Sequence, residues 1–313
     1  MEKQSMIINS ILSNDNLNRA YKQVVKNKGA AGIDGMECEA LFAHLRTNGA
    51  QLKESIRNQA YNPLPVKRVE IPKEDGSKRK LGIPTVTDRL IQQAGAQVLT
   101  PIYERIFHRN SYGFRSEKSA QQAVLKAIEY MNDGYNWVVD IDLEKFFDTV
   151  DHNKLISILN KEIKDGKVLS LIRKFLVSGV MVGEHMEETE IGTPQGGNLS
   201  PLLANIILNE LDWELEKRKL KFVRYADDCI ILVRSQKAAQ RVMDSIAKYI
   251  ESKLLLKVNR KKSKIGRPTE IKYLGFTFYN QFKAKKYKAK AHEKSVQKVV
   301  RKLKQLTSRR WGV

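Results

Sequence analysis

The stretch Phe222-Val-Arg-Tyr-Ala-Asp-Asp-Cys-Ile-Ile-Leu-Val233 sets two adjacent carboxylates, Asp227 and Asp228, between two apolar runs. Short apolar runs on either side of a polar tip are typical of two strands joined by a tight turn. We therefore expect a β-hairpin with both acids at its tip. An ordinary turn, in which Asp is common, would explain the acids equally well from this stretch alone.

A second pair of acids lies upstream, in Trp137-Val-Val-Asp-Ile-Asp142. The alternation of a strand puts Asp140 and Asp142 on the same face. Acids on a strand this apolar are costly unless something neutralises them. Neighbouring strands lie about 4.8 Å apart, so a strand that pairs beside the hairpin would bring Asp142 and Asp227 to the same small volume.

Carboxylates brought together in this way suit divalent-metal chemistry. Two Mg²⁺ ions about 3.5–4 Å apart can activate an attacking hydroxyl and stabilise a leaving pyrophosphate oxygen. Mg²⁺ usually takes one or two protein carboxylates and completes its shell with substrate phosphates and water. Because successive side chains of a strand diverge, we expect Asp227 to be the shared ligand and Asp228 a weaker or outer contributor.

The composition of the chain points to nucleic acid as a partner. Its 313 residues suggest two domains or subdomains. Lys and Arg number 56 against 35 Asp and Glu, a formal net charge of +21. A positive excess of this kind is typical of proteins that neutralise phosphates, although solubility alone is the plainer explanation.

The sequence also argues against several other classes. Cys38 and Cys229 form no CxxC or Cys/His cluster, so we expect neither a zinc site nor an oxidising compartment. The start, MEKQSMIINSIL, is unlike a secretory signal, and no apolar run approaches the ~18 residues of a membrane span. A soluble, cytoplasmic protein without a membrane partner is expected.

Strands and helices are mixed without a regular βαβ alternation, which predicts the α+β class. A basic hairpin is predicted over 65–84, with an Asp-Gly turn at 75–76 and Pro72 at a sheet edge. A long helix is expected to begin at Ser200. Apolar spacing predicts further helices around 17–25, after Ser116, after Asp151, over 236–252 and over 296–306, and a single short strand over 273–278.

Taken in order, the motifs resemble those of a reverse transcriptase, most closely the type encoded by group II introns. The N-terminal, fingers and palm blocks of that family are similar to Gly29-Ala-Ala-Gly-Ile-Asp-Gly35, Lys80-Leu-Gly-Ile-Pro-Thr-Val-Thr-Asp-Arg89, Ser111-Tyr-Gly-Phe-Arg115, Val139-Asp-Ile-Asp-Leu-Glu-Lys-Phe-Phe-Asp148, Gly192-Thr-Pro-Gln-Gly-Gly197, Tyr225-Ala-Asp-Asp228 and Tyr273-Leu-Gly-Phe276. Each motif alone is modest evidence, but the full set in chain order is a specific signal.

The resemblance implies a right-hand polymerase fold of the α+β class, with an antiparallel palm sheet backed by helices. It implies an N-terminal extension and fingers with some palm helix over 1–135, and a palm mixed with fingers insertions over 136–290. Residues 291–313 would then begin a basic thumb or linker helix. Because the family's thumb has several helices, the thumb of this chain is missing or only begun.

The resemblance also implies catalytic roles. Asp142, Asp227 and Asp228 match the catalytic acids. The ligands of two Mg²⁺ ions would be Asp142, Asp227 and the backbone carbonyl of Leu143. Phe147 matches the residue that excludes a ribose 2′-hydroxyl and so selects deoxynucleotides, although either aromatic of the Phe146-Phe147 pair could be plain core.

Contacts to substrates follow from the same resemblance. Contacts to the incoming dNTP are implied for Lys67, Lys73, Arg79, Phe147, Gln195 and Gly196. Cations at such positions offset charge that develops on the leaving pyrophosphate, but each lysine could equally be a solvated surface residue. Contacts to template or other RNA are expected from Arg115, Gly29 and Gly32, with packing of the fingers as the alternative for Arg115.

The leading hypothesis is RNA-directed DNA synthesis by the protein of a mobile group II intron, which would also bind intron RNA as a maturase. Its expected partners are an RNA template, a DNA or RNA primer, dNTPs, intron RNA and a second copy of the chain in a homodimer. Two alternatives stay open. One is a retron-like, diversity-generating or defence-associated reverse transcriptase, and the other is a purely structural RNA-binding splicing factor.

Overall fold

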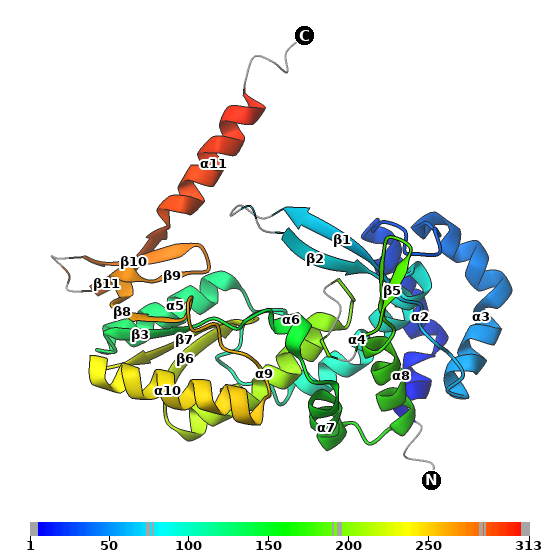
Figure 1. Cartoon of the computed structure of the whole chain (residues 1–313), viewed down its shortest axis with the longest axis horizontal. Coiled ribbons are helices and arrows are strands. Elements are labelled where there is room, and N and C mark those ends of the chain that lie inside the picture. The colour runs from blue at the N-terminus through cyan, green and yellow to red at the C-terminus, as the bar shows by residue number, and fades with distance from the viewer. Residues whose placement is uncertain are drawn as a thin grey trace. The chain divides into compact units, whose positions relative to one another are not determined.

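The computed structural model describes residues 6–72, 76, 78–189, 191, 192, 196–281, 284 and 286–307. The chain divides into two compact units, each assembled from segments distant in sequence (Figure 1). Unit 1 comprises Met1–Phe107, Lys145–Leu208 and Leu254–Leu256, and unit 2 comprises His108–Glu144, Asn209–Lys253 and Lys257–Val313. Because the units interleave along the chain, the boundaries expected at 135 and 290 stay a prediction.

Unit 1 is built mainly from helices. They are α1 (Met6–Ile11), α2 (Asn14–Lys26), the 3₁₀ turn η2 (Cys38–Ala40), α3 (Leu41–Arg57), α4 (Val86–Glu104), α6 (Phe146–Thr149), α7 (His152–Glu162), α8 (Gly166–Leu176) and the first half of α9 (Ser200–Lys217). Ser13, Thr85 and Asp151 cap α2, α4 and α7, because each side chain accepts a backbone N–H of the first turn. The helices predicted around 17–25, after Asp151 and from Ser200 are confirmed.

A buried amide fixes α2 on α4. Asn16, 2% exposed, donates from Nδ2 to the carbonyl of Ala94 at 2.9 Å, and Gln97 donates to Asn16 Oδ1 at 2.8 Å. An amide with partners on both of its polar atoms specifies one orientation, because a buried polar group left unpaired costs about 1–3 kcal/mol. The N-terminal helices therefore have a defined register on α4.

The sheet of unit 1 has the strand order β2-β1-β4-β5. Its strands are β1 (Val66–Pro72), β2 (Lys78–Ile83), β4 (Val180–Val182) and β5 (His185–Glu187). The antiparallel pairing of β1 with β2 confirms the predicted basic hairpin. β1 is an inner strand, so the edge position predicted for Pro72 is wrong for the strand as a whole. Pro72 pairs with Lys78 of β2, whereas β4 pairs only with Val66 and Lys67 of β1, so Pro72 lies beyond the β1–β4 ladder.

Unit 2 is centred on a sheet of order β6-β7-β3-β8, in which all neighbours are antiparallel. Its strands and main helices are β3 (Trp137–Ile141), β6 (Lys221–Tyr225), β7 (Asp228–Val233), β8 (Lys264–Gly266), α5 (Ala120–Asn132), α10 (Gln236–Lys253) and the second half of α9. Figure 1 shows α5 and α10 on opposite sides of these strands. An antiparallel sheet backed by helices is the architecture that the sequence predicted.

The core of unit 2 lies between α5 and this sheet. Its buried side chains include Ala123, Val124, Ala127, Met131, Val138, Val223, Ile230 and Leu232. Since strand residues alternate between faces, the face that buries Val138 and Ile230 also carries Asp140, Asp142 and Asp228. The acids thus lie at the edge of a packed apolar face.

A smaller sheet of order β11-β10-β9 follows in unit 2. It contains β9 (Lys272–Tyr273), β10 (Phe276–Gln281) and β11 (Lys286–Ala291), after the 3₁₀ turn η3 (Pro268–Glu270). The prediction of one strand over 273–278 is wrong. Leu274 and Gly275 adopt φ of +49° and +84° and reverse the chain, so β9 and β10 pair as a hairpin.

The chain described here continues into α11 (Glu293–Leu306), which confirms the helix predicted in the basic tail. Its apolar stripe is exposed and consists of Val296, Val299, Val300, Leu303 and Leu306. The assignment of this helix to a thumb stays a prediction. Within the described ranges, no helix is both long and apolar enough to cross a lipid bilayer.

Candidate active site

The pairing of β3 with β7 brings the predicted catalytic acids of unit 2 together. Ile141 lies opposite Cys229 in this antiparallel register. Continued by one position, this register would set Asp142 opposite Asp228, and the charge of Asp142 is close enough to act on the Asp228 carboxyl. Asp228 directly follows Asp227, which lies in the turn between β6 and β7. The hairpin predicted from the sequence is therefore present, with Asp227 in its turn and Asp228 at the start of β7. That Asp227 and Asp142 meet at one metal site stays a prediction.

The electrostatics of unit 2 reflect this crowding of negative charge. Desolvation raises the pKa of Asp228 to about 6, and three nearby carboxylates add to the rise, those of Asp227, Asp140 and Asp142. Part of Asp228 remains exposed to solvent. Burial also raises the pKa of Asp140 to about 6, against the favourable charge of Lys264. Carboxylates that repel one another in this way favour a cation between them.

A second loop of unit 2, residues 257–263, holds the segment that carries Asp142. The N–H of Asn259 donates to the carbonyl of Asp142 at 2.8 Å, and the N–H of Glu144 donates to a carbonyl of the same loop at 2.8 Å. These two bonds lie on either side of Leu143, which forms an antiparallel β-bridge with Val258. In a bridge bonded in this way, the N–H and C=O of the central residue point away from the partner segment. The Leu143 carbonyl is thus oriented away from the ladder, as a metal ligand requires.

The turn that carries Asp227 is fixed by residues that the sequence did not single out. Ala226 has a left-handed φ of +55°, and its carbonyl accepts a hydrogen bond from Arg224 Nη1 at 2.8 Å. Arg224 is fully buried and pairs with Asp212 of α9. A Cβ added to Gly113 would lie 2.2 Å from the backbone nitrogen of Ala226. The sequence signal that could have identified Arg224 is its charge inside the otherwise apolar run of β6.

The predicted nucleotide contacts belong to unit 1. The β1–β2 register puts Lys67 and Arg79 on the same face of the hairpin, and both side chains are exposed. Gly196, with φ of +120°, approaches β2 so closely that an added Cβ would lie 2.3 Å from the carbonyl oxygen of Gly82. The glycine-rich loop, residues 192–197, therefore meets β2 at Gly196, and this position needs glycine.

The two adjacent phenylalanines of α6 have different environments. Phe146 is buried, 3% exposed, whereas Phe147 is only partly buried. Their rings meet edge to face, with centroids 5.0 Å apart. Phe146 is thus the core aromatic, and Phe147 retains exposed surface that a substrate could contact.

The residues predicted to contact RNA near the N-terminus pack inside unit 1. An added Cβ at Gly29 would lie 2.1 Å from Arg89 Nη1, and one at Gly32 would lie 2.7 Å from the Cα of Thr85. Arg89 Nη2 also donates to the carbonyl of Ala30 at 2.8 Å. Close packing against the backbone at Thr85 is a sufficient reason for Gly32, whereas Gly29 meets only the end of the Arg89 side chain. The RNA contact of both glycines stays a prediction.

Arg115, in unit 2, also has structural partners. Its Nη1 donates to the carbonyls of His108 at 2.7 Å and Ser111 at 3.0 Å. These bonds favour the packing alternative, and contact with a template stays a prediction.

Two of the predicted nucleotide contacts, Lys73 and Gln195, lie outside the described residues. Within the described ranges, no three His, Cys, Asp or Glu side chains converge as a ready-made metal cage, and this holds for Asp142, Asp227 and Asp228 as well. Mg²⁺ usually takes only one or two carboxylates from a protein. The donor set of Asp142, Asp227 and the Leu143 carbonyl therefore fits this ion.

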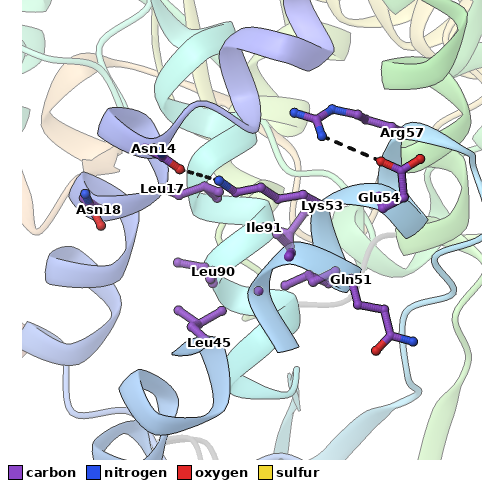
Figure 2. Close-up of a pocket in the computed structure, with 13 residues that line it drawn as sticks. Asn14, Leu17, Asn18, Leu45, Gln51, Lys53, Glu54, Arg57, Leu90 and Ile91 are labelled. Carbon is purple, nitrogen blue, oxygen red and sulfur yellow. Dashed lines mark hydrogen bonds and ion pairs between the residues drawn. The ribbon is translucent and has the colours of Figure 1, made fainter. Parts of the chain in front are cut away.

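A pocket of about 890 Å³ lies in unit 1, where Figure 2 shows residues of α2, α3 and α4 around it. Its lining includes the apolar side chains of Leu17, Leu90 and Ile91, and Lys53 bonds to Asn14 across it. None of the predicted catalytic, nucleotide-binding or RNA-binding residues lines this pocket. It is separate from the candidate site.

Comparison with known proteins agrees with this arrangement. A family model described as reverse transcriptase (RNA-dependent DNA polymerase) matches residues 71–278. Protein YkfC of Escherichia coli (strain K12) is 33% identical over 303 residues, which cover 84% of this chain and 78% of YkfC. The group II intron-encoded protein LtrA of Lactococcus lactis subsp. cremoris is 41% identical over 212 residues, which cover 67% of this chain and 35% of LtrA.

A solved structure shares the fold. Telomerase from Candida albicans, in complex with a TWJ fragment of telomeric RNA, matches with a TM-score of 0.56 at 14% identity, over 80% of this chain and 50% of that chain. At this identity the match shows the fold alone.

The chain belongs to the reverse transcriptase family, with a right-hand polymerase fold of the α+β class. Its likeness to a group II intron-encoded protein confirms the group to which the sequence motifs pointed. The chain spans most of YkfC but only about a third of LtrA.

Proposed function

We propose that this chain catalyses RNA-templated DNA synthesis with two Mg²⁺ ions. The observation that supports the proposal is the β3–β7 register, whose continuation puts Asp142 near Asp228, the sequence neighbour of Asp227. In the proposed reaction a primer 3′-hydroxyl attacks the α-phosphate of a dNTP, and pyrophosphate leaves. Bound Mg²⁺ would supply charge neutralisation for the phosphates and a lower pKa for the attacking hydroxyl.

The residues of unit 2 would hold the reacting phosphates through bound Mg²⁺ and not by direct contact. Asp142, Asp227 and the Leu143 carbonyl present fixed oxygens, because the loop 257–263 and the turn at Ala226 leave them little freedom. Asp228 would add negative charge close by. Oxygens fixed in this way need no rearrangement during the reaction. Such preorganisation is the main source of catalysis in sites of this kind.

The residues of unit 1 would bind the nucleotide. We propose that Lys67, Arg79 and Lys73 of the basic hairpin contact its triphosphate and that Gly196 and Gln195 contact the nucleotide from the glycine-rich loop. Phe147 would exclude a ribose 2′-hydroxyl. The exposed cations on one face of β1 and β2 and the close approach of Gly196 to β2 support this assignment.

Primer extension tests the proposal. The wild-type chain is expected to extend a DNA primer on an RNA template with dNTPs and Mg²⁺. Asp227→Ala and Asp142→Ala should each abolish extension and leave the dissociation constant for RNA unchanged, because the positive surface is retained. Full extension by Asp227→Ala with Mg²⁺ would refute the assignment.

We also propose a second role, the binding of intron RNA as a maturase. The net charge of +21 and the similarity to a group II intron-encoded protein support it. A splicing assay with Asp227→Ala separates the two roles, since a maturase needs only its RNA-binding surface. Cytoplasmic location and homodimer formation stay predictions.

A further inference from the structure

A fully buried ion pair lies beside the catalytic turn of unit 2. Arg224 and Asp212 are both 0% exposed, and the guanidinium binds the carboxylate through two bonds, Nε to Oδ1 at 2.7 Å and Nη2 to Oδ2 at 2.5 Å. Nη2 also donates to Ser111 Oγ at 2.7 Å. Two parallel bonds to one carboxylate fix the plane of a guanidinium and not only its position.

The remaining guanidinium nitrogen reaches the turn itself. Nη1 of Arg224 donates to the carbonyl of Ala226, the residue before Asp227, at 2.8 Å. Ala226 has φ of +55°, a conformation that costs a residue with a side chain roughly 1–2 kcal/mol. Strained conformations persist only where their surroundings over-determine them. Arg224 is one such restraint.

The segment Ser111–Gly113, in which Ser111 forms an isolated β-bridge with Arg224, supplies a second restraint. The N–H of Tyr112 donates to the carbonyl of Arg224 at 2.8 Å, and the N–H of Arg224 donates to Asn110. Gly113 then lies so close to Ala226 that no side chain fits between their backbones. The turn is therefore held both by Arg224 and by this segment.

Stability alone does not account for the ion pair. Burying two charges is costly, and replacing such a pair by apolar side chains of similar volume is often neutral or stabilising. What an apolar pair would lose is the hydrogen bond to Ala226 and the fixed plane of the guanidinium. Both act on the backbone that aims Asp227.

We propose that Arg224, Asp212 and Gly113 are positioning residues that set the direction of the Asp227 carboxylate for divalent-metal binding. The proposal rests on the proposed polymerase function. None of the three residues is assigned contact with metal or substrate. Each acts through the backbone of Ala226.

The test is the double variant Arg224→Met with Asp212→Leu, in the full chain. Its readouts are the melting temperature, the dissociation constant for RNA, and Mn²⁺ affinity by electron paramagnetic resonance with primer–template and a non-hydrolysable dNTP bound. We expect the double variant to fold and to bind RNA like wild type. Its Mn²⁺ affinity and its extension rate should each fall about 10–100-fold, the effect seen when residues that orient metal ligands are removed.

A surface pair provides the matched control. Arg57 and Glu54 of α3 also form an arginine–carboxylate pair, at 3.8 Å, but both side chains are exposed. Arg57→Met with Glu54→Leu removes the same groups and should change neither Mn²⁺ affinity nor the Mg²⁺ concentration for half-maximal extension.

If the buried double variant does not fold, the single variant Gly113→Ala tests the same inference. Its methyl group must displace the backbone at Ala226, so metal affinity should fall. Gly166→Ala, where nothing lies within 4 Å of an added Cβ, should leave metal affinity at its wild-type value. Wild-type Mn²⁺ affinity in a folded Arg224→Met/Asp212→Leu protein or in Gly113→Ala overturns this inference alone. A wild-type chain that extends no primer overturns the proposed function instead.

Discussion

Asp140 shows how the charge of the site acts on the fold. It shares a strand face with Asp142 but is not one of the expected metal ligands, and burial raises its pKa to about 6. An ordinary Asp titrates near 3.9. The folded chain therefore holds the Asp140 proton more tightly than the unfolded chain does. The cost to stability grows as the pH rises from about 4 and is fully present above about pH 6.

Asp140→Asn tests this at the residue scale. In the metal-free protein at pH 7.5 the substitution should raise the melting temperature by roughly 2–4 °C, the shift that about 1 kcal/mol gives in a domain of 150–250 residues. Near pH 3.5, where both the folded and the unfolded chain hold the proton, the gain should be largely gone. Circular dichroism melts measure both values, with the exposed Asp133→Asn as the control. An equal gain at both pH values would contradict the account.

The adjacent phenylalanines allow a second test at this scale. Phe147→Ala should raise the ratio of rNTP to dNTP kcat/KM by roughly 10–200-fold, the range over which steric contacts discriminate between substrates. Phe146→Ala should instead lower the free energy of unfolding, by about 3–5 kcal/mol for a buried aromatic, and leave the ratio unchanged. Steady-state incorporation and urea unfolding measure the two effects. A changed ratio in Phe146→Ala alone would reverse the assignment.

At the scale of elements, the contact between the glycine-rich loop and β2 carries a prediction. In Gly196→Ala the new methyl group would overlap the carbonyl of Gly82, and φ of +120° is unfavourable for alanine. We expect KM for dNTP to rise about tenfold, which corresponds to ~1.4 kcal/mol. Gly49→Ala, inside α3 with only Leu45 4.0 Å away, should stabilise the chain by about 0.5–1 kcal/mol. An unchanged KM in Gly196→Ala would contradict the proposed contact.

Elements with a strong local pattern were predictable from the sequence. The hairpin around Asp227 and the helices with clear caps follow from alternation, period and capping residues, which depend on near neighbours. The strand over 273–278 was predicted wrongly because Leu274 takes a left-handed φ that its side chain does not favour. The Arg224–Asp212 pair joins β6 to α9, and only the folded structure reveals such a contact.

At the scale of the whole molecule, the net charge of +21 should dominate RNA affinity. Binding that releases counterions weakens as salt rises, with log K falling by about 0.7 per phosphate contact per decade of salt for single strands. We expect a steep salt dependence that is the same for the wild type and for Asp142→Ala, measured by fluorescence anisotropy between 50 and 200 mM NaCl. Affinity that does not depend on salt would remove the electrostatic basis of the RNA-binding proposal.

The central claim is that Asp142 and Asp227, 85 residues apart in the sequence, bind the same divalent cations. Iron-mediated hydroxyl-radical cleavage tests it most directly, because Fe²⁺ at a Mg²⁺ site cuts only the backbone close to it. With primer–template and a non-hydrolysable dNTP bound, we predict cuts both at 140–144 and at 225–229. Excess Mg²⁺ should suppress both sets of cuts, and Asp227→Ala should abolish both. Cuts confined to one of the two segments, or loss of only one set in Asp227→Ala, would contradict a shared site.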